Sequence, residues 1–115
     1  MVTAIILFAI GALFGLHILT NVLKNKPTPK TSVLLHGLFV AVPLLMVIIA
    51  VINRENVTST LTASMIFFLI AALGGFAMVF LDFGKKQLPP KGLAILHPIL
   101  AVVGLVLLIV YTFGS

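Results

Sequence analysis

The sequence predicts an all-α integral membrane protein, a four-helix up-down bundle made of two repeated transmembrane hairpins. Hydrophobic residues make up 62% of the 115 residues, charged residues make up 8%, and the mean hydropathy is +1.35. A soluble domain of this length has too much surface for its volume to bury so many apolar side chains. The apolar residues also form four runs, each close to the roughly 20 residues with which a helix crosses a bilayer, and the two halves of the chain repeat each other.

The four runs are the expected helices of one transmembrane domain, residues 1–115. They cover residues 2–23, 31–52, 60–83 and 92–113. The first run has no basic segment before it and is longer than the apolar part of a signal peptide, so we expect it to be kept as a helix. The second run follows Thr28-Pro29, where threonine suits the N-cap and proline suits the first helical position.

The third run follows Thr58 and Ser59, either of which can cap its helix, and Pro89-Pro90 open the fourth run. The connections are short, about 7 to 9 residues, which favours antiparallel neighbours. In such a bundle the first and third helices are diagonal partners, and so are the second and fourth.

Charge gives the expected orientation of the bundle in the membrane. Six of the seven basic residues lie in or beside the first and third connections: Lys24, Lys26, Lys30, Lys85, Lys86 and Lys91. The second connection pairs Arg54 with Glu55. Short lysine-rich connections stay in the cytoplasm, so we expect both termini to face outward. The pI near 10.1 then reflects topology and attraction to anionic lipid headgroups rather than nucleic-acid binding.

An internal repeat relates the two halves, residues 9–52 and 69–113. Pairs in the lysine-rich connections and beyond them are 61 residues apart: Pro29 with Pro90, Lys30 with Lys91, Leu35 with Leu96, and His36 with His97. Pairs before those connections are 60 apart: Ala12 with Ala72, Leu13 with Leu73, and Gly15 with Gly75. Such a period indicates a duplicated helical hairpin. It places one imidazole from each half at the same depth, related by an approximate two-fold axis.

All three histidines of the chain fall in one layer. His17 lies 7 residues before Lys24, and His36 and His97 each lie 6 residues after the lysine that opens their helices. At about 1.5 Å of rise per residue, all three sit about 9–10 Å inside the lysine-rich boundary. Ionisable groups inside a bilayer are expensive and indicate function by default. The alternative, a hydrogen bond to a neighbouring helix, suits a single histidine such as His17 better than the repeated pair.

His36 and His97 are the candidate metal ligands. Neutral imidazole is a good axial ligand for haem iron, and the core of a bundle is a common place for such a site. Because the chain has no cysteine, c-type haem attachment, thiolate clusters, iron–sulfur ligation and disulfides are excluded. A porphyrin is a flat and largely apolar disc that needs gaps between helices. Gly15, Gly37 and Gly75 are candidates for such gaps, or only for close helix packing.

Further candidates surround the pair. Lys30 and Lys91 lie about two turns from the histidines, where an ammonium group could pair with a haem propionate. His17 has Ala77 as its counterpart in the repeat, so it has no symmetry mate. We consider three roles for it: bonding a propionate, relaying a proton, or ligating the metal of a second site that one chain supplies incompletely.

The arrangement resembles the small four-helix membrane b-type cytochromes with bis-histidine haem. The stretches KPTPK…LLHG and LPPKG…LHP also resemble a family of short bacterial membrane proteins with a duplicated hairpin. The likeness covers nearly the whole chain. It implies one haem b per chain with His36 and His97 as axial ligands, electron transport with quinone or a small reductant, and a bacterial inner-membrane location. It leaves a homodimer open.

The chain departs from the larger b cytochromes, whose paired haems need four histidines. Three histidines cannot bis-ligate two haems in one chain. A single haem near one face leaves most of a roughly 30 Å hydrocarbon core unbridged. The resemblance therefore implies an electron carrier on one side of the bilayer.

Three other functions remain as alternatives. His17, His36 and His97 could form a zinc or copper site, since three histidines and a water are a known catalytic set. A small multidrug-type transporter has a similar length but needs a carboxylate in its first helix, and residues 2–23 contain none. Asp82 falls at the end of the third helix, where we expect a solvated interfacial charge. A structural membrane subunit is the third alternative, and the residues do not decide whether the protein is an enzyme.

Overall fold

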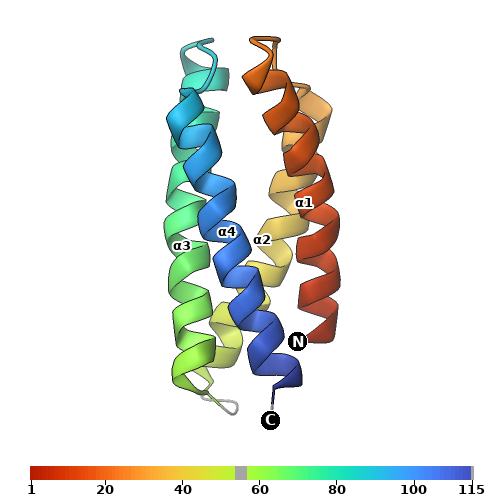
Figure 1. Cartoon of the computed structure of the whole chain (residues 1–115), viewed down its shortest axis with the longest axis vertical. Coiled ribbons are helices and arrows are strands. Elements are labelled where there is room, and N and C mark those ends of the chain that lie inside the picture. Colours follow the sequence, from red (N-terminus) through yellow and green to blue (C-terminus); the bar gives the residue numbers. More distant parts are fainter. Residues whose placement is uncertain (54–56, 115) are drawn as a thin grey trace.

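A computed structural model describes residues 1–53 and 57–114, and within these ranges the chain forms an antiparallel bundle of four long α-helices (Figure 1). The helices are α1 (Val2–Leu23), α2 (Lys30–Ile52), α3 (Ser59–Val79) and α4 (Lys91–Phe113), and a short π-helix, η1 (Phe80–Gly84), continues α3. Each of the four spans is long and apolar enough to cross a membrane. The predicted all-α membrane bundle is confirmed. Arg54, Glu55 and Ser115 lie outside the described residues.

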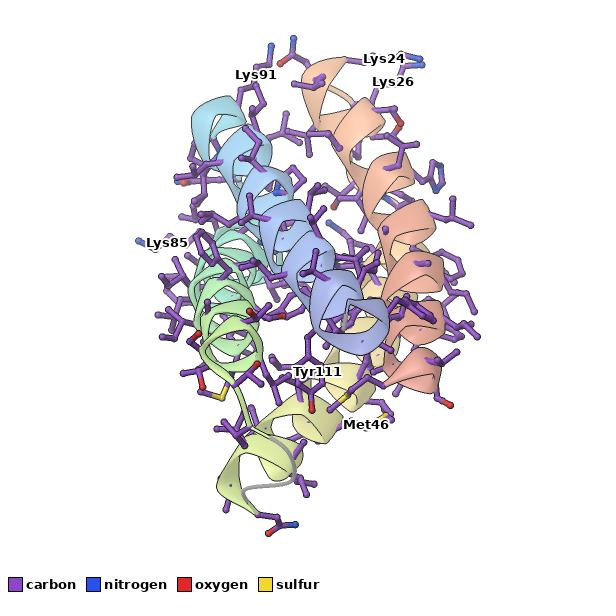
Figure 2. The ribbon with its side chains drawn as sticks, turned by 60° about the horizontal axis from the view of Figure 1, so that its bottom comes forward. Lys24, Lys26, Met46, Lys85, Lys91 and Tyr111 are labelled. Atoms are coloured by element: carbon purple, nitrogen blue, oxygen red, sulfur yellow. The ribbon has the colours of Figure 1, made fainter. Side chains whose placement is uncertain are left out.

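The bundle consists of two hairpins, α1 with α2 and α3 with α4. The hairpins contact each other through α1 with α4 and through α2 with α3, so α2 and α4 lie on a diagonal of the bundle. Figure 1 shows both termini at one end and the two lysine-rich connections at the other. Lys24, Lys26 and Lys91 project from this second end in Figure 2, and Tyr111 and Met46 lie toward the first. We call them the lysine end and the terminal end.

The closest packing of the two hairpins lies in the terminal half of the bundle. Phe8 of α1 stacks on Phe68 of α3, with ring centroids 4.1 Å apart and ring planes 9° apart. Gly104 gives this ring room on α4, because a Cβ there would lie 3.2 Å from Phe68. Leu61 and Leu108 are completely buried beside them. Inside a bilayer, close packing of this kind holds helices together, since lipid tails are as apolar as the side chains.

Local signals at the helix starts are partly as predicted. Thr58 caps α3, its hydroxyl accepting a hydrogen bond of 3.2 Å from the backbone N–H of Leu61. In contrast, α2 begins at Lys30, so Pro29 is the N-cap residue and Thr28 precedes it. Thr28 does not cap α2, because its hydroxyl is a hydrogen-bond donor to Asp82 on the other hairpin.

The π-helix lies in the interval where the repeat changes register. Asn25 and Lys86, which are 61 residues apart, both have positive φ, 57° and 52°, so the two lysine-rich connections turn in the same way. Because Gly15 and Gly75 are only 60 apart, the second hairpin carries one extra residue between Gly75 and Lys86. A π-turn is the way a helix accommodates such a residue, and η1 supplies it through a 3.3 Å bond from the N–H of Lys85 to the carbonyl of Phe80.

Candidate functional site

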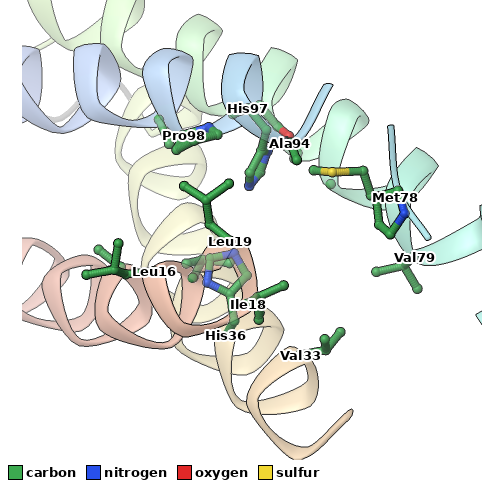
Figure 3. Close-up of a pocket in the computed structure, with 18 of the residues that line it drawn as sticks. Leu16, Ile18, Leu19, Val33, His36, Met78, Val79, Ala94, His97 and Pro98 are labelled. Atoms are coloured by element: carbon green, nitrogen blue, oxygen red, sulfur yellow. Dashed lines mark hydrogen bonds between the residues drawn. The ribbon is translucent and has the colours of Figure 1, made fainter. Parts of the chain in front are cut away.

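His36 and His97 face each other between the two hairpins. His36 comes from α2 and His97 from α4, so the rings approach across the diagonal of the bundle (Figure 3). Their centroids lie 6.1 Å apart and their planes are 74° apart. The repeat placed these histidines at one depth, and the structure brings their rings together.

Each ring is held by a backbone carbonyl of the preceding helix. The Nδ1 atom of His36 lies 2.8 Å from the carbonyl oxygen of Gly11, and the Nδ1 atom of His97 lies 2.7 Å from that of Ala71. Because a carbonyl oxygen only accepts, Nδ1 must be the protonated nitrogen in both rings. In a neutral imidazole this leaves Nε2 with a free lone pair. The two rings therefore present the nitrogen that ligates metals in the tautomer that metal sites use.

Two glycines form the seats on which the rings lie. A Cβ at Gly15 would lie 3.0 Å from Cε1 of His36, and a Cβ at Gly75 would lie 3.2 Å from Cε1 of His97. A side chain at either position would push the ring away from its carbonyl. Gly37 is different, since a Cβ there would meet nothing within 4 Å. Gly15 and Gly75 are thus part of the site, whereas Gly37 only neighbours His36 in sequence.

A cavity of about 470 Å³ lies between the hairpins and includes both rings in its wall. This volume is in the range of about 300–1,000 Å³ typical of cofactor sites. Its lining is largely apolar and includes Leu19 of α1 and Val33 of α2 (Figure 3). Besides the histidines, the polar side chains in the wall of the described chain are Thr28 and Asp82.

Thr28 and Asp82 belong to a polar cluster that joins the hairpins at the lysine end. The hydroxyl of Thr28 donates to Oδ2 of Asp82, and the ammonium of Lys30 donates to Oδ1 at 2.7 Å and to the Thr28 hydroxyl at 2.8 Å. Thr28 is 5% exposed, and the side chain of Asp82 is 10% exposed. The sequence suggested a solvated charge at Asp82. That expectation is wrong, because η1 turns its carboxylate toward the first hairpin.

The remaining candidates lie apart from the paired rings. His17 is exposed on α1, does not line the cavity, and has its Nδ1 atom 2.8 Å from the hydroxyl of Ser32. Lys91 extends outward from the lysine end (Figure 2). Across the described residues, no group of three or more histidine, cysteine or acidic side chains is placed to hold a metal ion. The three-histidine zinc or copper site therefore gains no support.

The sequence pointed to the two rings and their glycines but not to the groups that orient them. The carbonyls of Gly11 and Ala71 are backbone acceptors, which no side-chain pattern reveals. Their only signal is the spacing: these residues are 60 apart, and each lies four residues before a seat glycine. The carboxylate of Asp82 was missed because its direction depends on the π-turn.

Comparison of the chain with protein-family models, with curated proteins and with solved structures gives no match.

Proposed function

We propose that the protein is a membrane-bound b-type haem protein that carries electrons, with His36 and His97 as the axial ligands. The observation that carries the proposal is the shared geometry of the two rings. Each Nδ1 donates to a helix carbonyl, which leaves each Nε2 of the neutral rings unprotonated and able to ligate a metal. A hydrogen bond from the second ring nitrogen fixes the orientation of a ligating histidine and raises its basicity.

The spacing of the rings suits one metal ion between them. A metal bound to imidazole nitrogen lies about 2 Å from it, so one ion held by both rings would keep their Nε2 atoms within about 4 Å of each other. Ring centroids 6.1 Å apart are of the size that this arrangement needs. The apolar cavity beside the rings suits a flat apolar macrocycle. When bound, the haem iron would supply one-electron redox chemistry.

We also propose an orientation of the bundle in the membrane and a cellular location for the protein. Six of the seven basic residues lie at the lysine end, which favours a cytoplasmic location for that end and an external location for both termini. His36 and His97 each lie 6 residues from the first residue of their helix at the lysine end and 16 residues from its last residue, so the rings are nearer to the lysine end by about three turns. Electron exchange would then take place on the cytoplasmic side of an inner membrane, with quinone or a small reductant as the partner.

A visible spectrum of the purified protein, first oxidised and then reduced with dithionite, tests the proposal. We expect a sharp b-type α-band on reduction and a low-spin spectrum in both states. His17→Ala is the matched control, because it removes the one histidine that does not face the cavity. Folded protein that stays colourless after reconstitution with haem would contradict the proposal.

A further inference from the structure

The polar cluster at the lysine end of the cavity has the chemistry of a carboxylate-binding site. Thr28 and Lys30 donate to the two different oxygens of one carboxylate, that of Asp82. Charge-assisted hydrogen bonds of this type are about twice as strong as neutral ones. Thr28 is buried, so its hydroxyl needs a partner on this side. Thr28 and Lys30 therefore form a ready site for a carboxylate, and a side chain of this protein fills it.

We infer that Asp82 occupies this site in place of a carboxylate of the ligand, and that a porphyrin propionate takes its position when the cavity is filled. The inference rests on the proposed function for the identity of the ligand. A ligand of this class needs an apolar body and a carboxylate on one edge. The cavity offers an apolar wall for the body of such a ligand and a polar cluster for its carboxylate, since Thr28 and Asp82 line the same space as His36 and His97.

The distances along the helices fit such a ligand. Lys30 opens α2, and His36 follows six residues later, so the two side chains start about 9 Å apart along the helix axis. A porphyrin carries both propionates on one edge, so a ring centred between the imidazoles turns that edge toward one end of the cavity. At the other end the apolar stack of Phe8 on Phe68 offers no cation. The lysine end is therefore where the carboxylates belong.

The position of Asp82 in the chain also allows its carboxylate to move out of this site. Its segment, η1, is a π-helix, a rare form that occurs mostly as a single turn within an α-helix. Lys85 and Lys86 follow three and four residues later, so a displaced carboxylate has cations close by at the membrane surface. Lys30 would keep an anionic partner throughout, because the incoming carboxylate replaces the outgoing one.

The carboxylate site can be tested apart from iron ligation with metal-free protoporphyrin IX and its dimethyl ester. Neither compound contains iron, and only the first has free carboxylates. The full-length protein in detergent is titrated with each compound and the change in porphyrin fluorescence gives the Kd. Asp82→Asn removes the competing charge, so we expect it to tighten binding of the free acid about tenfold and to leave the ester unchanged. Lys30→Gln should weaken binding of the free acid about tenfold and leave the ester unchanged.

Lys91→Gln is the matched control, because Lys91 occupies the same repeat position as Lys30, whereas among the described residues it is Lys30 that pairs with Asp82. It should change neither Kd. If the free acid and the ester bind equally well in every variant, or if Asp82→Asn weakens both, the carboxylate site is wrong. That result is distinct from failure of the haem proposal, because metal-free porphyrin binds without axial ligation and low-spin haem is read from its own spectrum.

Discussion

In the first hairpin, His36 donates to the carbonyl of Gly11 and lies over Gly15; in the second, His97 donates to the carbonyl of Ala71 and lies over Gly75. The histidine, the carbonyl residue and the glycine of the first hairpin each occupy the same repeat position as their counterpart in the second. The surroundings of the two sets do not correspond. His17 bonds Ser32 in the first hairpin, and the matching residues of the second are apolar. The two rings therefore share a carbonyl acceptor and a glycine seat.

The largest expected effect comes from removing either ring. One haem held between two histidines needs both of them, so His36→Ala and His97→Ala should each abolish the low-spin spectrum, and to the same extent. The measurement is the reduced-minus-oxidised spectrum of each variant, corrected for folded protein by size-exclusion chromatography. A low-spin spectrum that survives one substitution but not the other would break the equivalence of the two hairpins.

A smaller effect is expected from filling the glycine seats. Gly15→Leu and Gly75→Leu place a side chain where a Cβ alone would lie 3.0 Å and 3.2 Å from the ring. Each should displace its histidine and convert much of the low-spin haem to a high-spin form. Gly37→Leu is the control, because space beside Gly37 is open. If all three variants give the wild-type spectrum, the seats do not position the rings.

His17→Ala should have a modest effect. His17 has no counterpart in the second hairpin and does not line the cavity, so the haem and its low-spin spectrum should be retained. A shift in reduction potential is the expected change, because the hydrogen bond to Ser32 joins α1 to the helix that carries His36. The potential is measured by redox titration beside Ser32→Ala, which breaks the same bond. Loss of haem from the His17 variant would make this histidine a ligand.

The smallest change tests only the topology of the bundle, that is, whether both hairpins insert into the membrane with the same orientation. Reporter fusions after Lys26 and after Gln87, one in each lysine-rich connection, should both give a cytoplasmic signal. A fusion at Ser115 should give an external one. Opposite signals from the two lysine-rich connections would mean that the hairpins are inverted, and the histidines would then lie at different depths.

The helices and the depth of the histidines could be predicted from the sequence. The directions in which the histidine side chains point could not. A long apolar run in a membrane has to be a helix, since its backbone groups find no other partners there. Depth follows from the rise per residue, which is why all three histidines fell in one layer. Direction follows from rotation: His17 is two residues beyond Gly15, about 200° around α1. A helix that turns Gly15 toward His36 therefore turns His17 away.

Asp82 could not be placed by this reasoning. A regular α-helix through residues 80–84 would give its side chain another direction, and nothing in the local sequence announces a π-turn. The one available sign was the change from a 60-residue to a 61-residue register across this segment. A change of that kind in a repeat marks an inserted residue, and a helix absorbs an insertion by a local π-turn.

The even number of helices in each repeat has a consequence for how this protein can evolve. A two-helix unit enters and leaves the membrane on the same side, so a second copy joined to it inserts with the same orientation. Two separate copies would have to be identical, and each substitution in one would appear in the other. A single polypeptide removes this constraint. One half can acquire a lone histidine and the other an additional carboxylate while both continue to supply one imidazole each.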